Sequence, residues 1–464
     1  MSDPRDSLHR PGRDLSEAPD TAGTPSVEPA GGVVRAVLST HVGALKRQAS
    51  LLRDVASVYG VQLANYVFPL VTVPYLTRVL GPAAWGLIAM AQAFAMYGHL
   101  IVEYGFIYSA TRELAGNTDR LQIERVIAGV TGARVLLSGG VLLLAYAGFC
   151  WVPLFHQHPL LLWAAVISEI LKAALPNYYF YGMQQVSLAS TLDISARTAS
   201  LLGVFFLVKK PEDAWIFFGL QGAGAALALA ISHWMIFSRY SMRTPRIEDG
   251  IRMLKEGAAM FLFRSSHNLY VLGNAFILGL FAPAQDVGFY AGAEKVNSAA
   301  VGLLSPLSTA LYPRAASMAK TEMKKAARLT TLSVYAMLAI SLLLTLIMWF
   351  GAPLIVRILL GTHYQPSTGV MKVLSLRAPL VAFTNVLGFQ WLLALGLERP
   401  FQKVTMAALG MNLLLATCLA PRFSFIGMAW AVVFSQGLAV LGIYIVLRRR
   451  RLNPFLISSG AVYA

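Results

Sequence analysis

The chain has 464 residues, of which 56% are hydrophobic and only 13% charged, and its mean hydropathy is +0.60. This composition excludes an ordinary water-soluble protein and predicts an all-α, polytopic integral membrane protein. The formal net charge of +16 would suggest nucleic-acid binding in a soluble chain. Here the basic residues lie in short loops between apolar segments, as the positive-inside rule describes, so nucleic acid is not an expected partner.

Residues 1–45 are rich in Pro, Gly, Ser, Asp and Arg and have no periodic apolar pattern, which predicts a disordered tail. No segment before residue 50 has the apolar centre of a signal peptide. We therefore expect the tail to stay in the cytoplasm and the first apolar run to be a true membrane span.

The remainder of the chain predicts about 12 transmembrane helices of twenty residues or more. They cover residues 54–79, 84–110, 123–149, 159–182, 187–208, 213–237, 254–281, 286–312, 328–350, 369–396, 402–420 and 424–447. The first six form an N-terminal lobe at residues 46–243 and the last six a C-terminal lobe at residues 244–452. A short C-terminal tail follows at residues 453–464.

Basic residues fall mostly in the loops on one side of these spans, which predicts that both termini are cytoplasmic. The loops on the other side contain only five basic residues, namely Arg78, Lys209, Lys210, Arg357 and Arg422.

The two lobes share a sequence pattern. Pro82 and Gly86 bracket the first turn of the N-terminal lobe, and Gln92 follows six residues after the glycine. In the C-terminal lobe Pro283, Gly288 and Glu294 repeat the order. Six spans in each half give a parallel internal repeat, whose binding site is expected between the halves.

Polar groups inside the apolar spans mark candidate site residues. Arg264 lies in the seventh span on one helical face with His267, Asn268 and Asn274. A charge at mid-membrane costs about 3 kcal/mol or more, so it faces a partner or a wet cavity. Two alternatives remain open for Arg264: it pairs with an acid on another helix, or it lines a transport cavity. Lys372 and Arg377, in the tenth span, also have no acid within reach along the helix.

Further polar side chains form stripes that we expect to line the same cavity. They are Gln62, Asn65, Gln92, His99 and Asn297. Two charged pairs, Glu169 with Lys172 and Asp193 with Arg197, have helical spacing at which each pair neutralises itself locally. A structural role is favoured for both pairs.

Several classes of function lack their motifs. The sequence has no phosphate-binding GxxxxGK[ST] loop, no HExxH and no cluster of Cys and His. No nucleophile, base and orienting group occur together. We expect no enzymatic activity, no cofactor and no metal site.

A family resemblance rests on short motifs in a fixed order. They are PYLTRVLGPAAWG at residues 74–86, EYGFIYSATRELA at 103–115, YYFYGMQQ at 178–185, VGFYAGAEKV at 287–296, LYPRAA at 311–316, LLGTHYQPS at 359–367 and ALGLERP at 394–400. In this respect the chain resembles the Wzx-type polysaccharide flippases of the multidrug/oligosaccharidyl-lipid/polysaccharide transporter superfamily. The likeness extends over nearly all of residues 50–450.

The resemblance implies two six-helix lobes around a central cavity in the bacterial inner membrane. It also implies alternating access for a polyprenyl-diphosphate-linked oligosaccharide, with membrane lipids, a polysaccharide polymerase and a chain-length regulator as expected partners. Cations would bind the diphosphate: Arg264 and Arg377 first, because guanidinium offers a bidentate fork, and then Lys295, Lys372 and Arg78. The acids considered for ion coupling are Glu103, Asp193 and Glu294.

Three alternatives remain. A multidrug extruder of the same superfamily would need cavity acids, and the first span has none after Asp54, its first residue. A lipid II flippase usually has two further helices. A membrane scaffold would not need unpaired basic residues on inward faces.

Overall fold

The computed structural model describes residues 31–241, 248–258, 261 and 273–459, with side chains from residue 67 onward. Within this part of the chain every regular element is helical, which confirms the predicted all-α class. The chain divides into two units, Met1–Arg53 and Asp54–Ala464, and apart from the start of the first helix the features below belong to the second.

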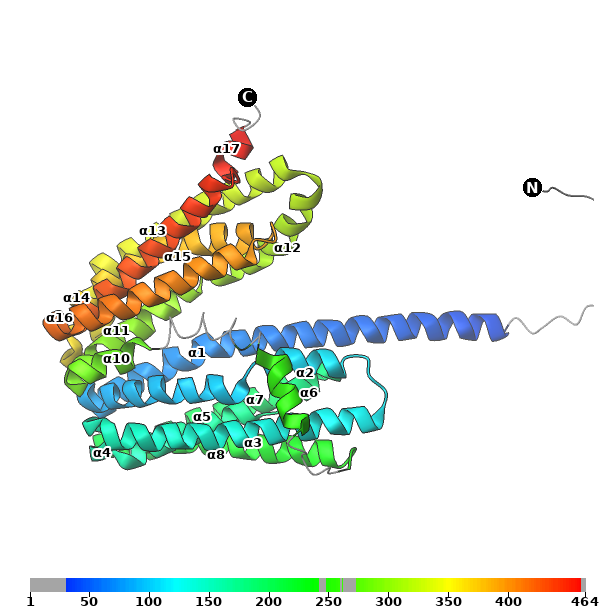
Figure 1. Ribbon diagram of the computed structural model, residues 1–464, viewed down its shortest axis with the longest axis horizontal. Helices are drawn as coiled ribbons and strands as arrows, with labels where there is room; N and C mark the ends of the chain where they lie inside the picture. Colours follow the sequence, from blue (N-terminus) through cyan, green and yellow to red (C-terminus); the bar gives the residue numbers. More distant parts are fainter. Residues whose placement is uncertain (1–30, 242–247, 259–260, 262–272, 460–464) are drawn as a thin grey trace, which may run out of the picture. The chain divides into compact units, whose positions relative to one another are not determined.

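The N-terminal half of the described chain is built from long helices joined by short breaks (Figure 1). Its elements are α1 (Gly31–Glu103), α2 (Phe106–Leu114), α3 (Arg120–Trp151), α4 (Pro153–Gln157), α5 (Pro159–Ala174), α6 (Asn177–Gly182), α7 (Val186–Leu207), η1 (Pro211–Asp213) and α8 (Ala214–Phe237). Because α1 begins at Gly31, residues 31–45 are helical where the sequence predicts disorder.

The C-terminal half has the same character. Its elements are α10 (Asn274–Phe281), α11 (Ala284–Gly302), α12 (Ser305–Thr321), α13 (Met323–Leu359), η2 (Thr362–Tyr364), α14 (Ser367–Ser375), α15 (Arg377–Phe383), the π-helical η3 (Thr384–Leu392), α16 (Glu398–Arg449) and α17 (Pro454–Ser459).

Seven helical segments of the described chain are long and apolar enough to cross a membrane. About 20 residues suffice for one crossing, so the two longest, Val67–Leu114 with 48 residues and Glu398–Arg449 with 52, can each supply two. Non-helical backbone at Gly81 and Ser424 breaks these two segments, and Figure 1 shows α1 folding back on itself. The chain is therefore a multi-pass membrane protein, and the arrangement of twelve spans in two lobes stays a prediction.

Neighbouring helices form antiparallel hairpins held by side-chain hydrogen bonds. Ser200 Oγ of α7 donates to the Leu220 carbonyl of α8 at 3.0 Å, on opposite sides of η1. Gln390 Nε2 donates to Ser333 Oγ at 3.2 Å across the turn that contains η2. Within α16, Asn412 Nδ2 donates to Ser435 Oγ at 3.3 Å, so the two parts of α16 pack against each other around Ser424.

Segments that the charge pattern assigns to the outer side meet one another. The Tyr75 hydroxyl donates to the Val208 carbonyl at 2.8 Å. Arg78 donates to the Ile358 carbonyl, and Ser424 donates to Asp286. These contacts agree with the predicted grouping of the turns at one end of the helices.

The two turns of the sequence repeat cross each other at their glycines. A Cβ atom on Gly86 would overlap with the Ala284 carbonyl oxygen, and a Cβ atom on Gly288 would overlap with the Pro82 carbonyl oxygen. Pro82 and Ala284 each lie four residues before the glycine of their own half. The contact is thus reciprocal, and only residues without a side chain allow α1 and α11 to approach this closely.

Candidate functional site

A cavity of about 700 Å³ lies in the N-terminal half. This volume is within the range of small-ligand sites. Its walls come mainly from α1, α5, α7 and α8, and one residue of α11, Lys295, joins them. Part of the wall is apolar, with Leu76, Trp85 and Val204. The remainder carries an unusual number of ionisable and amide side chains for an apolar bundle: Gln92, His99, Glu103, Arg134, Glu169, Lys172, Asp193, Arg197, Gln221 and Lys295.

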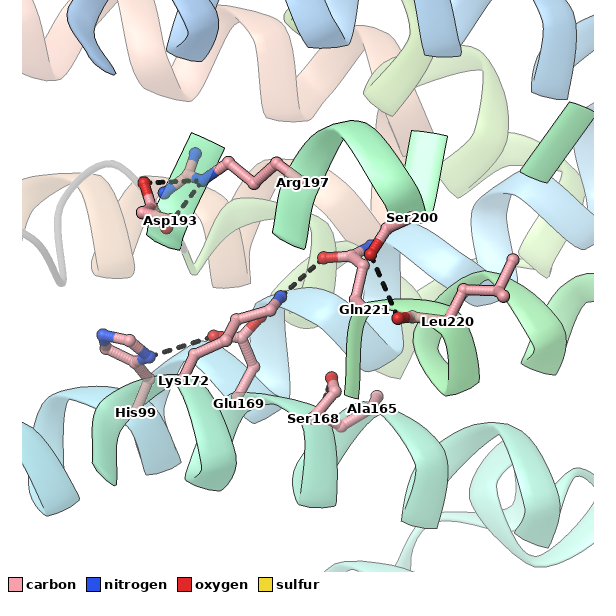
Figure 2. A network of polar contacts seen from close by, with 10 residues as sticks. All are labelled: His99, Ala165, Ser168, Glu169, Lys172, Asp193, Arg197, Ser200, Leu220 and Gln221. Carbon is pink, nitrogen blue, oxygen red and sulfur yellow. Dashed lines mark hydrogen bonds and ion pairs between the residues drawn. The ribbon is translucent and has the colours of Figure 1, made fainter. Parts of the chain in front are cut away.

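Glu169 is at the centre of an ionic network in this wall (Figure 2). Its Oε2 lies 3.0 Å from His99 Nδ1, and its Oε1 accepts a hydrogen bond of 2.7 Å from Lys172 Nζ. Lys172 Nζ also donates to Gln221 Oε1 at 2.5 Å. The network therefore connects α1, α5 and α8.

The members of the network differ in how far they are buried. The Glu169 side chain is 5% exposed, whereas those of His99 and Lys172 are 24% and 26% exposed. The carboxylate thus lies behind the two nitrogen groups, which face the cavity. A buried carboxylate is stable only with such partners, because an unpaired charge in this environment is costly.

A second ion pair lies on α7. Arg197 Nε is 3.0 Å from both carboxylate oxygens of Asp193, one helical turn before it (Figure 2). These side chains are 44% and 27% exposed, so water screens this pair more than the Glu169 network. The structure forms both local pairs that the sequence spacing predicts, and it also places both on the cavity wall.

Arg134 is a buried cation that the sequence analysis did not identify. Its Nη1 donates to the carbonyls of Ala174 at 2.8 Å and Leu175 at 3.1 Å, where α5 ends. Pro176 prevents the helix from continuing, so these carbonyls lose the donors of a longer helix, and the Leu175 carbonyl accepts instead from the Asn177 backbone N–H at 2.8 Å. The guanidinium also lies over the Tyr178 ring, 5.1 Å from its centroid. Arg134 therefore stabilises a helix end, and an arginine inside the predicted third span was the available signal for it.

The charges on the cavity wall do not cancel completely. Three carboxylates, from Glu103, Glu169 and Asp193, face four permanent cations. Three of these cations have acceptors, as described above. The fourth cation, Lys295, lines the cavity without a hydrogen-bond or ion-pair partner among the described residues.

Five of the residues predicted from the sequence come together on this wall. They are Gln92, His99, Glu103, Asp193 and Lys295. The first three lie on α1 at helical spacing, and the others reach the same space from α7 and α11. Glu169 and Lys172 were predicted only as a local pair, and the contact of Lys172 with Gln221 was missed, because contacts between helices leave no periodic signal in the sequence.

Three other predicted cations lie elsewhere. Arg78 is exposed and donates from Nη2 to the Ile358 carbonyl of α13, so it joins two helices instead of lining this cavity. Lys372 lies half-buried on α14. Arg377 begins α15, and its Nε is buried without a partner among the described residues.

The predicted polar residues of the C-terminal half are also separate from the cavity wall. Asn297 is fully buried, with Nδ2 3.8 Å from Met348 Sδ. Asn274 is buried on α10. Glu294 accepts a hydrogen bond of 2.6 Å from Ser298 Oγ. Arg264, His267 and Asn268 lie outside the described residues, as do the side chains of Gln62 and Asn65.

Known proteins with similar sequences are transporters. Over 411 residues the chain is 28% identical to a candidate O-antigen transporter of Escherichia coli (strain K12), which covers 87% of this chain and 98% of that protein. It is 25% identical over 394 residues to a protein of the same designation from Shigella dysenteriae, covering 84% of this chain and 98% of that one.

Two solved structures have a similar fold. The lipid II flippase MurJ in an inward closed conformation superimposes with a TM-score of 0.66 at 12% identity, covering 89% of this chain and 91% of that one. An inward-facing multidrug resistance transporter of the MATE family, from the MOP superfamily, gives 0.61 at 14% identity and covers 84% and 96%. At such identities the likeness concerns the fold alone.

The sequence profile of one family matches more than half of the chain. The family is described as polysaccharide biosynthesis protein, and the match covers residues 51–319. This range includes every residue that lines the cavity. The chain therefore belongs to the polysaccharide biosynthesis protein family.

Proposed function

We propose that this chain is a Wzx-type flippase that moves a polyprenyl-diphosphate-linked oligosaccharide across the bacterial inner membrane, for O-antigen, capsule or exopolysaccharide synthesis. Movement is from the cytoplasmic to the outer leaflet by alternating access. Its family, and relatives designated as O-antigen transporters rather than enzymes, support this function. A polysaccharide polymerase and a chain-length regulator are the partners that would consume the cargo.

The observation that carries the proposal is the charged cavity inside an apolar helix bundle. A lipid-linked diphosphate loses much of its hydration on entering the membrane, and that loss must be offset by charge-assisted contacts. Lys295, which lacks a partner among the described residues, can supply one such contact. An acyl or prenyl chain needs no such wall, so the charged wall fits the head group of the cargo.

Transport by purified protein tests this function directly. In proteoliposomes that contain a fluorescent polyprenyl-diphosphate oligosaccharide, we expect the protein to make the glycan accessible to an external glycosidase. Other polyprenyl diphosphates should compete. Empty liposomes are the control, and no increase in accessibility over them would contradict the proposal.

A multidrug extruder is the second candidate, because three carboxylates line the cavity wall and could attract an organic cation. Two of them, Glu169 and Asp193, are already paired with basic residues of the chain, which weakens that attraction. The same proteoliposomes decide between the two functions. Proton-driven uptake of an organic cation that is unaffected by the lipid-linked glycan would favour the extruder.

Arg264, Arg377 and Lys372 remain proposed ligands of the diphosphate from the C-terminal half. We expect Arg264→Ala to abolish glycan export while the protein still accumulates in the membrane. Arg264→Lys should recover only part of the export, because a lysine cannot make the bidentate contact. Export is measured by surface polysaccharide in a strain that lacks its own flippase. Degradation of the alanine variant would instead assign Arg264 to a pair that assembles the helices.

A further inference from the structure

We propose that Glu169 is an internal counter-ion of Lys172, and that the diphosphate of the cargo takes the place of the Glu169 carboxylate on the lysine when the cargo binds. This inference rests on the proposed function and assigns Lys172 as a cargo ligand in the N-terminal half. The exchange involves no covalent step: one carboxylate leaves the ammonium group, and a phosphate oxygen takes its place.

The geometry of Lys172 is suited to an exchange. Its Nζ contacts Glu169 Oε1 at 2.7 Å and Gln221 Oε1 at 2.5 Å. An ammonium group carries three N–H donors, so two acceptors leave one donor for a ligand. The lysine is 26% exposed and lies on the cavity wall, so a ligand in the cavity can reach this donor.

Glu169 keeps a neighbouring polar group when it loses Lys172. Its second oxygen, Oε2, lies 3.0 Å from His99 Nδ1 on a different helix. Removing the sole partner of a buried charge would be strongly unfavourable. Because His99 remains beside the carboxylate, the network keeps one contact when the flexible lysine side chain turns toward the cargo.

Other cations of the wall are less suited to this role. Arg134 is committed to the carbonyls that end α5. Arg197 is held by both oxygens of Asp193 and is more exposed. Lys295 reaches the cavity from α11, so a diphosphate between it and Lys172 would contact residues of both halves of the chain. Binding at this position would thereby link the cargo to the relative position of α5 and α11.

The test is a double-mutant cycle. Calorimetry measures the affinity of the purified full chain, in detergent, for farnesyl diphosphate. Lys172→Gln should weaken binding about tenfold, because it removes a charge-assisted hydrogen bond. Glu169→Gln should tighten binding about tenfold, because the lysine no longer has an internal competitor. The double variant should resemble Lys172→Gln, since Glu169 acts through that lysine.

Asp193→Asn is the matched control, because it removes a carboxylate from a local ion pair in the same cavity wall. If charge alone mattered, it would tighten binding as much as Glu169→Gln, and that result would overturn the exchange. A double variant that returns to wild-type affinity would also overturn it, since the two effects would then be independent.

Glu169→Asp provides a second measurement if the glutamine variant does not accumulate. The shorter side chain keeps the negative charge but withdraws it from Lys172, so we expect tighter binding of farnesyl diphosphate. Unchanged or weaker binding by this variant would contradict the exchange.

Inorganic pyrophosphate distinguishes the two sources of a diphosphate group. Tighter binding of farnesyl diphosphate than of pyrophosphate assigns the site to a lipid head group, and equal binding assigns it to free diphosphate. Both results support the exchange if the variants behave as expected. A wild-type chain that binds neither probe would contradict the proposed function itself, whereas binding with independent variant effects would overturn only the role of Glu169.

Discussion

Arg134 illustrates how one side chain can stabilise a break in a membrane helix. Its guanidinium donates to two carbonyls at the end of α5, where Pro176 stops the helix, and it lies over the Tyr178 ring. A guanidinium suits this task because its planar fork donates to two neighbouring acceptors at once. The break in turn sets where α5 ends and α6 begins, beside the cavity.

We expect Arg134→Gln to lower the free energy of unfolding by about 2 to 4 kcal/mol, because it removes the charged donor that the Ala174 and Leu175 carbonyls share and its contact with the Tyr178 ring. Arg134→Lys should lose less, since it keeps the charge but not the fork. Thermal unfolding of the detergent-solubilised protein, followed by size-exclusion chromatography, measures the change.

Arg197→Gln is the comparison for Arg134, because Arg197 is 44% exposed and its pair is solvent-screened. It should change stability by less than about 1 kcal/mol. An Arg134→Gln protein that is as stable as wild type would show that the helix break does not depend on this residue.

Part of the site could be predicted from single residues. Gln92, His99 and Glu103 lie on the cavity wall because helical spacing puts them on one face, and that spacing is visible in the sequence. The contacts of Lys172 with Gln221 and of Arg134 with Ala174 join segments far apart in the chain. No local pattern reports such contacts, so the sequence could not predict them.

The crossing of α1 and α11 leaves no space for a side chain at either of its two glycines. A Cβ on either Gly86 or Gly288 would overlap with a backbone carbonyl oxygen of the other helix. Backbone cannot move aside as a flexible side chain can, so a substitution must separate the helices themselves.

We expect Gly86→Ala and Gly288→Ala each to destabilise this contact by about 1 to 3 kcal/mol and to reduce glycan export. Gly410→Ala is the control, because open space surrounds that helical glycine. It should leave export unchanged and stabilise α16 slightly, since alanine favours a helix. Export by both crossing variants at the rate of the control would show that the helices need not approach this closely.

Helices as elements were largely predictable, whereas their interruptions were not. The long apolar runs predicted the segments that cross the membrane. The predicted span 159–182 contains the break at Leu175, and the span 84–110 contains left-handed backbone at Gly105. At the first break Pro176 stops the helix locally, and Arg134 of another helix supplies donors to the carbonyls there.

At the scale of the whole molecule, orientation in the membrane is the open prediction. We expect membrane-impermeant thiol reagents applied to intact cells to label cysteines introduced at positions 157, 285 and 363, but not at 120, 248 or 322. All six positions are exposed in the structure, so a difference in labelling reports the side of the membrane and not burial.

The experiment requires replacement of the native Cys150 and Cys418, because both are exposed. Permeabilised cells, in which all six positions should react, provide the control for accessibility. Labelling of the second group in intact cells would invert the orientation derived from the charge pattern.

The reciprocal crossing of the two halves has the form of an isologous interface, in which two subunits use the same surface on both sides of a twofold axis. In this single chain the two backbone contacts at the glycines are reciprocal, but the side chains six residues after the glycines differ between the halves. Six residues after its glycine, one half has Gln92 on the cavity wall, whereas the other has Glu294 bonded to Ser298. The two halves therefore share one backbone contact but place different side chains beyond it, a neutral amide in one and a carboxylate in the other.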